Sequence, residues 1–141
     1  MESKELRRGN IVSFNGSSDE ELVKVERIDT FYIGIRRMNW HNFWLRLCTI
    51  DINNLRGAPL TDEILKCTNL EYVPSSYIYL MPTGTIYSNY GIKFEVWSDC
   101  IKCFIGGVKI ELKYIHELQN LCFAITGEEL EINEKQLKIN R

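Results

Sequence analysis

Three polar residues near the end of the chain, His116, Gln119 and Asn120, have the side chains to form a site. They lie in "YIHELQNLCFAITG" (residues 114–127), where most other residues are apolar at helical spacing. On a helix Gln119 falls inside the apolar arc, and leaving a buried amide unpaired costs about 1–3 kcal/mol. Gln119 therefore needs a partner, which is either the backbone of a neighbouring strand or a ligand in a pocket. We favour the backbone, which makes the trio a structural anchor.

The stretch "RRMNWHNFWLR" (residues 36–46) is the strongest candidate for a ligand-binding site. Aromatic faces stack on bases and arginine pairs with phosphate, so the stretch could hold a nucleotide or a single strand. The alternative is a hairpin whose aromatic side chains fill the core while its arginines face solvent. The residues that we expect to bind are Arg36, Arg37, Trp40, His41, Trp44 and Arg46.

The pair Cys100-x-x-Cys103 is half of a zinc site. The pair falls in an alternating strand, where positions three apart point to opposite faces. No second close pair is present to complete a site, since the remaining candidate ligands are Cys48, Cys67, His41 and His116. We therefore predict no metal, and we expect Cys122, on the apolar side of the helix, to lie in the core.

Other signatures of catalysis are missing from the sequence. It has no phosphate loop, dinucleotide fingerprint or His-Glu-x-x-His motif, and we predict no cofactor. The acidic run Glu128, Glu129, Glu131 and Glu134 is typical of a solvated face. One enzymatic function remains an alternative, a small hydrolase using His116 or His41. No nucleophile is visibly arranged beside either histidine.

The amino-acid composition excludes further classes of protein. The chain has 141 residues, is 45% hydrophobic and carries a net charge of -2, so it can form a core. Neither half has the positive excess that tight duplex binding usually shows, with nine Lys/Arg against eight Asp/Glu in residues 1–56 and eight against eleven in 57–141. The five cysteines are irregularly spaced, and the polar start has no signal-peptide pattern. The sequence also has no long apolar run. These features predict a reduced, cytoplasmic protein outside the membrane.

The elements that would position these residues are mostly short strands. Alternating or apolar runs predict strands in residues 10–15, 21–28, 31–37 and 43–52, which together form a small SH3-like sheet or barrel. After Pro59, Thr61 is a candidate N-cap with acidic residues behind it, so a short helix is expected in "PLTDEILKC". Further strands are predicted in residues 77–82, 84–89, 92–98 and 100–107.

One long helix is predicted from about Glu111 to Ile125, with Gly127 as its C-terminal cap. Its apolar arc spans roughly 200°, so we expect it to be packed on two sides, between sheets or at a dimer interface. The tail in residues 129–139 alternates and predicts an edge strand. The fold class is therefore α+β and β-rich, in a single compact domain (1–141) with possible sub-modules at 1–56 and 57–141.

Three motifs give the chain a resemblance to a known family. They are "ELRRGNIV" (5–12), "PLTDEILKC" (59–67) and "YIHELQNLCFAITGEEL" (114–130). They resemble an opening Glu-Leu-Arg-x-Gly-Asn, a central Pro-Leu-Thr-x-Glu-x-Leu and a closing His-x-Leu-Gln-Asn-Leu-x-Phe-Ala-x-Thr-Gly-Glu-Glu-Leu of small uncharacterised proteins from Bacteroidetes and their phages. Cys122 departs from the pattern, since the family often has an aromatic residue there. The resemblance implies a shared fold and a mobile-element setting, and it carries no established activity.

These observations favour a non-enzymatic intracellular binding protein of phage or mobile-element type. It would contact or sequester a host component, such as a defence protein or a nucleotide signal, and the wide apolar arc predicts a homo-oligomer. The alternatives are a nucleic-acid-binding accessory module using residues 36–46 and the small hydrolase.

Overall fold

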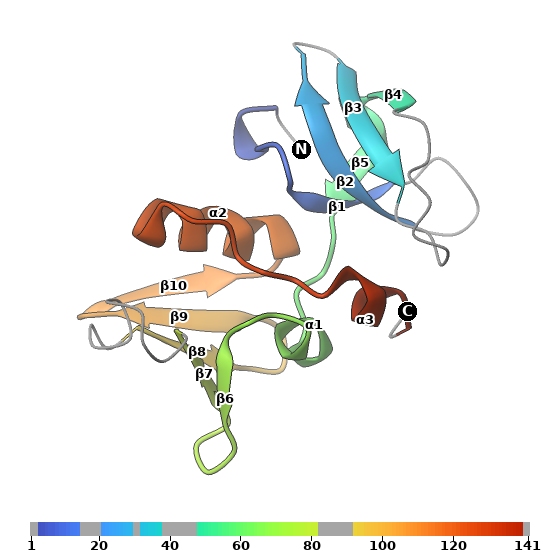
Figure 1. Cartoon of the computed structure of the whole chain (residues 1–141). Coiled ribbons are helices and arrows are strands. Elements are labelled where there is room, and N and C mark those ends of the chain that lie inside the picture. The colour runs from blue at the N-terminus through green and yellow to red at the C-terminus, as the bar shows by residue number, and fades with distance from the viewer. Residues whose placement is uncertain (1–2, 15–20, 30–31, 38–47, 82–91, 140–141) are drawn as a thin grey trace. The chain divides into compact units, whose positions relative to one another are not determined.

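The computed structural model describes residues 3–14, 21–29, 32–37, 48–81 and 92–139 (Figure 1). The chain divides into two compact units. The first contains Met1–Ala58 and Tyr114–Asn120, and the second contains Pro59–Lys113 and Leu121–Arg141. The predicted boundary between sub-modules, at residues 56 and 57, lies close to the first of these divisions. The prediction of a single compact domain stays a prediction.

The first unit is built on a five-stranded antiparallel sheet. Its strand order is β4-β3-β2-β1-β5, so consecutive strands pair from β1 to β4 and β5 returns to the free side of β1. The bounds are β1 (Ile11–Phe14), β2 (Glu21–Ile28), β3 (Tyr32–Arg37), β4 (Cys48–Asp51) and β5 (Leu55–Gly57), with 3₁₀ turns η1 (Ser3–Glu5) and η2 (Ile52–Asn54). The predicted N-terminal sheet is confirmed, although its described strands do not close into a barrel.

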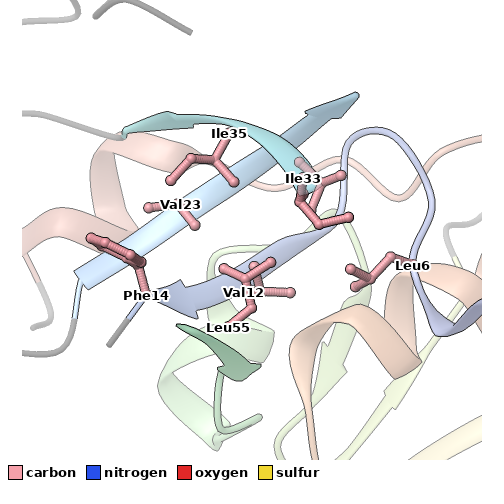
Figure 2. Close-up of a cluster of buried hydrophobic side chains, with 8 residues drawn as sticks. Leu6, Val12, Phe14, Val23, Ile33, Ile35 and Leu55 are labelled. Atoms are coloured by element: carbon pink, nitrogen blue, oxygen red, sulfur yellow. The ribbon is translucent and has the colours of Figure 1, made fainter. Parts of the chain in front are cut away.

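The core of the first unit follows from strand alternation. Val23 and Val25 on β2 and Ile33 and Ile35 on β3 are two residues apart, so each pair points to one face of the sheet, and all four are buried. Figure 2 shows Val23, Ile33 and Ile35 gathered with side chains from the adjoining strands. The complete cluster is Leu6, Val12, Phe14, Val23, Val25, Ile33, Ile35 and Leu55.

The second unit contains another five-stranded antiparallel sheet, in the order β10-β9-β8-β7-β6. Its strands are β6 (Glu71–Val73), β7 (Ile78–Leu80), β8 (Lys93–Val96), β9 (Ile101–Ile105) and β10 (Val108–Leu112). A row of cross-strand partners, Tyr79, Phe94 and Cys103, is buried and defines the inner face. The second α+β part of the prediction is therefore confirmed. The strand predicted at residues 84–89 lies outside the described residues.

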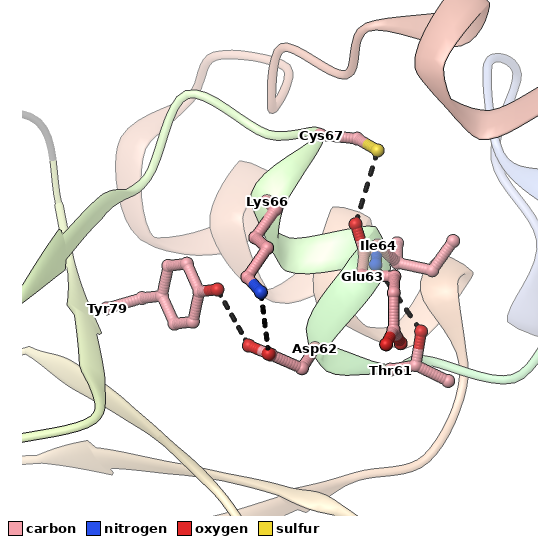
Figure 3. A network of polar contacts seen from close by, with 7 residues as sticks. All are labelled: Thr61, Asp62, Glu63, Ile64, Lys66, Cys67 and Tyr79. Carbon is pink, nitrogen blue, oxygen red and sulfur yellow. Dashed lines mark hydrogen bonds and ion pairs between the residues drawn. The ribbon is translucent and has the colours of Figure 1, made fainter. Parts of the chain in front are cut away.

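Helix α1 (Asp62–Lys66) begins where the sequence predicts. The Thr61 side chain accepts a hydrogen bond from the Ile64 N–H at 3.3 Å, as an N-cap does. Figure 3 shows how one carboxylate ties this helix to the sheet. The Tyr79 hydroxyl donates to Asp62 Oδ1 at 2.7 Å, and Lys66 Nζ lies 3.3 Å from Asp62 Oδ2. Burial and the bond to Asp62 raise the pKa of Tyr79, so its hydroxyl stays a donor.

Helix α2 (Ile115–Thr126) is shorter than predicted, and its expected start at Glu111 is wrong. Residues 108–112 form β10, because Gly106, at φ 58°, allows a tight turn that folds them back onto β9. The helix begins after Tyr114, whose N–H donates to the Glu117 carboxylate at 3.0 Å in half of a capping box. Gly127, at φ 74°, ends it as predicted.

The tail also differs from its prediction, because residues 134–139 form a helix instead of an edge strand. Only a single bridge pairs Ile132 with Thr68, and helix α3 (Glu134–Ile139) follows at once. Asn133 stands before its first turn, and its side chain accepts from the Gln136 N–H at 3.4 Å. The helical geometry buries Leu137, which is 1% exposed.

Candidate functional site

The anchor of the first unit is Gln119, which belongs to the part of α2 assigned to that unit. Its Oε1 accepts from the Ile11 N–H at 2.8 Å, and its Nε2 donates to the Gly9 carbonyl at 3.0 Å. One side-chain amide thus takes both the donor and the acceptor role that a paired strand would supply to the start of β1. These bonds support the anchoring interpretation of Gln119.

Asn120 extends the same network. Its Oδ1 accepts from Asn10 Nδ2 at 2.9 Å and from Arg7 Nη1 at 3.1 Å, while its Nδ2 donates to the Glu5 carbonyl at 2.9 Å. Asn10 is fully buried, and its own Oδ1 accepts from the Arg7 N–H at 2.7 Å. The network fixes the first turns of α2 against the segment that leads into β1.

This fixed corner borders a groove of about 780 Å³ that lies wholly within the first unit. The groove is bounded by η1, by β5 and by the first turns of α2. Its volume falls in the range of sites that hold small molecules or single side chains of a partner. The residues that line it are Glu5, Leu55, Arg56, Gly57, Tyr114, His116, Glu117 and Asn120.

His116 is the most unusual residue of this lining. It is only 4% exposed, and its Nδ1 is buried without a hydrogen-bond partner in the part of the chain that the structure describes. Burial lowers the pKa of His116 below its usual 6.5, against the opposing pull of the Glu117 and Glu5 carboxylates. The imidazole is therefore neutral at pH 7 and offers one acceptor nitrogen.

Tyr114 forms an aromatic wall beside this imidazole. The two rings are stacked, with centroids 5.8 Å apart and planes 9° from parallel. The Tyr114 ring also lies against the backbone of Gly57, where a Cβ atom would come within 2.4 Å of it. Only glycine leaves room for the ring here. Tyr114 remains 40% exposed, so part of its ring is open to a ligand.

The charges of the groove are predominantly acidic. Glu5 and Glu117 contribute two carboxylates, and Arg56 contributes one guanidinium. Arg56 pairs with Ser13 in the sheet, one position away from the buried Leu55, so its side chain leaves β5 on the face opposite to the core. Glu117 holds the helix start through Tyr114, whereas Glu5 is an exposed side chain on η1.

The predicted ligand stretch at residues 36–46 is described only at its start. Arg36 and Arg37 end β3, and Arg36 Nε lies 3.3 Å from a carboxylate oxygen of Glu26, which offsets part of its charge. The other four predicted residues, Trp40, His41, Trp44 and Arg46, lie outside the described residues. A nucleotide or nucleic-acid site on this stretch stays a prediction.

Four cysteines have buried thiols that form no disulfide, namely Cys67, Cys100, Cys103 and Cys122. Cys122 lies in the core as predicted. Burial raises the pKa of Cys103 and of Cys122 to about 12, so both stay protonated at neutral pH. Across the described ranges, no three His, Cys, Asp or Glu side chains gather closely enough to hold a metal ion.

Of the polar trio predicted from the sequence, His116 and Asn120 line the groove and Gln119 does not, and the other lining residues were not predicted. Glu5, Arg56 and Tyr114 come from segments far apart in the chain, and no local pattern links them. The one sequence feature that could have indicated the aromatic side of the groove is weak: Tyr114 precedes His116 by two residues, at the start of a helix.

No protein-family model, curated protein or solved structure matches this chain. The resemblance to Bacteroidetes and phage proteins therefore stays a prediction. Of the described helices, none has both the length and the apolar character needed to cross a membrane.

Proposed function

We propose that this is a non-enzymatic, cytoplasmic binding protein of the phage or mobile-element type, which contacts or sequesters a host component through the groove of the first unit. The observation that carries the proposal is made on His116, which lines that groove and whose buried Nδ1 has no hydrogen-bond partner among the described residues. A native fold pairs most of its buried polar atoms, and each exception calls for an explanation such as a functional role or a bound water or ion.

Preorganisation of the groove supports a role in binding. Gln119 and Asn120 use their amides on the backbone and on Asn10, so the turn that carries His116 is held by several long-range hydrogen bonds. Gly57 leaves room for the Tyr114 ring to lie against β5 beside the imidazole. A wall that is fixed before the ligand arrives costs less ordering when it binds.

The proposal is tested by capture of host components from lysate, followed by native mass spectrometry of the eluted protein. The wild-type chain is compared with Tyr114→Ala, which removes the aromatic wall, and with Tyr77→Ala, which removes an exposed tyrosine of the second unit. We expect the retained mass or partner to be lost in Tyr114→Ala and kept in Tyr77→Ala. Equal capture by both variants would place binding outside the groove and reject the proposal.

A further inference from the structure

We propose that the groove of the first unit receives the cationic head of a basic side chain, a guanidinium or an ammonium group, presented by a partner protein. This inference rests on the proposed function, because it names the chemistry of the ligand for the same groove. It favours a protein partner over a nucleotide signal.

Two carboxylates are among the groups that line the groove. Glu5 on η1 and Glu117 in the first turn of α2 can accept hydrogen bonds, and the neutral His116 ring beside them adds no positive charge. Both carboxylates lie near enough to His116 to act on its charge. A cation with N–H donors is attracted by these two negative charges, whereas a phosphate would face two like charges.

The groove also contains an aromatic ring. Tyr114 stands beside His116 with 40% of its surface exposed, and an aromatic face attracts a cation within about 6 Å of its centroid. A guanidinium can stack on such a ring while it donates in its own plane to a carboxylate. Tyr114 and Glu5 together supply these two contacts.

The remaining polar groups of the lining are Asn120 and Arg56. Asn120 already uses both ends of its amide on Arg7, Asn10 and the Glu5 backbone, so it holds the wall and does not compete for the ligand. Arg56 is the opposing charge, and it leaves β5 on the other face from Leu55. The lining therefore carries an excess of one negative charge with His116 neutral.

The experiment uses NMR spectroscopy of the full chain, which has only two histidines. The His116 ring signals are assigned by comparison with His41→Gln and are followed during titration with N-acetyl-L-arginine amide or with inorganic phosphate. We expect the arginine derivative to shift the His116 signals, with a dissociation constant on the order of 10 mM for so small a ligand. We expect phosphate to leave them unchanged.

A charge-neutralising pair of variants provides the control. Glu5→Gln keeps the shape of an exposed side chain and is expected to weaken binding of the arginine derivative about threefold, as loss of an exposed ion pair does. Glu128→Gln makes the same change at an exposed glutamate of the second unit and should bind like the wild type.

The outcomes separate this inference from the proposed function. Shifts with phosphate but not with the arginine derivative would overturn the cationic ligand and leave the groove as a binding site. No shift with either probe would also overturn the inference, and the capture experiment with Tyr114→Ala would then decide on the groove itself. Equal binding by Glu5→Gln and the wild type would remove Glu5 from the site and overturn the inference as argued.

Discussion

The side-chain amide of Gln119 contributes much of the stability of the first unit. Gln119 is 4% exposed and satisfies one backbone donor and one backbone acceptor at the start of β1. Replacing it by alanine leaves both backbone groups without their partner, and the cost of each such group is about 1–3 kcal/mol. We expect Gln119→Ala to lower the free energy of unfolding by at least about 2 kcal/mol in urea denaturation.

The matched control for this change is Gln136→Ala. Gln136 is an exposed residue of α3, and the hydrogen bonds described for it use its backbone N–H. Its loss should cost less than about 0.5 kcal/mol. Equal destabilisation by the two variants would show that the Gln119 bonds contribute nothing beyond helix propensity.

The buried imidazole of His116 makes stability depend on pH. Its pKa is lowered in the folded chain relative to the usual 6.5, so the unfolded chain binds more protons as the pH falls. The contribution of His116 to stability is therefore complete above pH 6.5 and is lost as the pH falls through its lowered folded pKa. We expect the free energy of unfolding to fall across this window in the wild type.

This pH dependence is measured by urea denaturation at a series of pH values in three chains. His116→Gln should flatten the slope below pH 6.5, because it removes the titrating ring. His41→Gln separates the contribution of the other histidine. A slope that survives in His116→Gln would assign the effect to carboxylates and not to this imidazole.

At the scale of elements, the contact between β5 and the segment before α2 depends on Gly57, whose lack of a Cβ atom makes room for Tyr114. Gly57→Ala would place a carbon within 2.4 Å of the Tyr114 ring, so the ring must move. We expect a loss of about 1–3 kcal/mol in the free energy of unfolding, which is typical of overpacking. The same variant should displace the aromatic wall of the groove.

A double-mutant cycle tests whether the clash is the cause. With Tyr114 already replaced by alanine, Gly57→Ala should cost far less than in the wild type, giving a favourable coupling energy between the two positions. Gly107→Ala is the control, because a Cβ there meets nothing within 4 Å and its φ is not in the left-handed region. Additive effects of Gly57→Ala and Tyr114→Ala would contradict the contact.

Strand alternation and helix caps were readable from the sequence because they depend on neighbouring residues. β1 to β3, the Thr61 cap of α1 and the Gly127 end of α2 follow this rule. The start of α2 was misplaced because "VKIEL" is apolar at positions that fit both a helix and a strand, and only the pairing of Ile110 with Cys103 decides between them.

The edge strand predicted in the tail was wrong for a related reason. Its alternation suits a strand, but a strand needs a partner along its length, and Thr68 supplies one bridge only. The groove could not be assembled from the sequence at all, since pairing of β5 with β1 and the hydrogen bonds of Gln119 span large separations. Two residues of the polar trio, His116 and Asn120, line this groove, and the lining residues of β5 are brought to it by the sheet topology.

At the scale of the whole molecule, the units are discontinuous in sequence. The first needs Tyr114–Asn120 in addition to Met1–Ala58. A fragment of residues 1–58 would keep every strand of the first sheet but lack the Gln119 and Asn120 anchors. We expect this fragment to unfold without a cooperative transition, as followed by circular dichroism during urea denaturation.

The full-length Gln119→Ala chain is the comparison for the fragment, because it loses one anchor and keeps the rest. It should unfold cooperatively at a lower urea concentration than the wild type. A fragment that unfolds with the midpoint of the wild-type chain would show that residues 114–120 are dispensable for the first unit.

The hydrogen bond between Ile11 and Gln119 joins residues 108 positions apart. Because synthesis on a ribosome runs from the N-terminus to the C-terminus, β1 is made well before Gln119, which holds it. Throughout that interval the Ile11 N–H and the Gly9 carbonyl must be satisfied by water or by another chain. The first unit therefore reaches its final form only after most of the second has been synthesised. A pause in translation before Gln119 would leave the nascent sheet without the Gln119 hydrogen bonds to the start of β1.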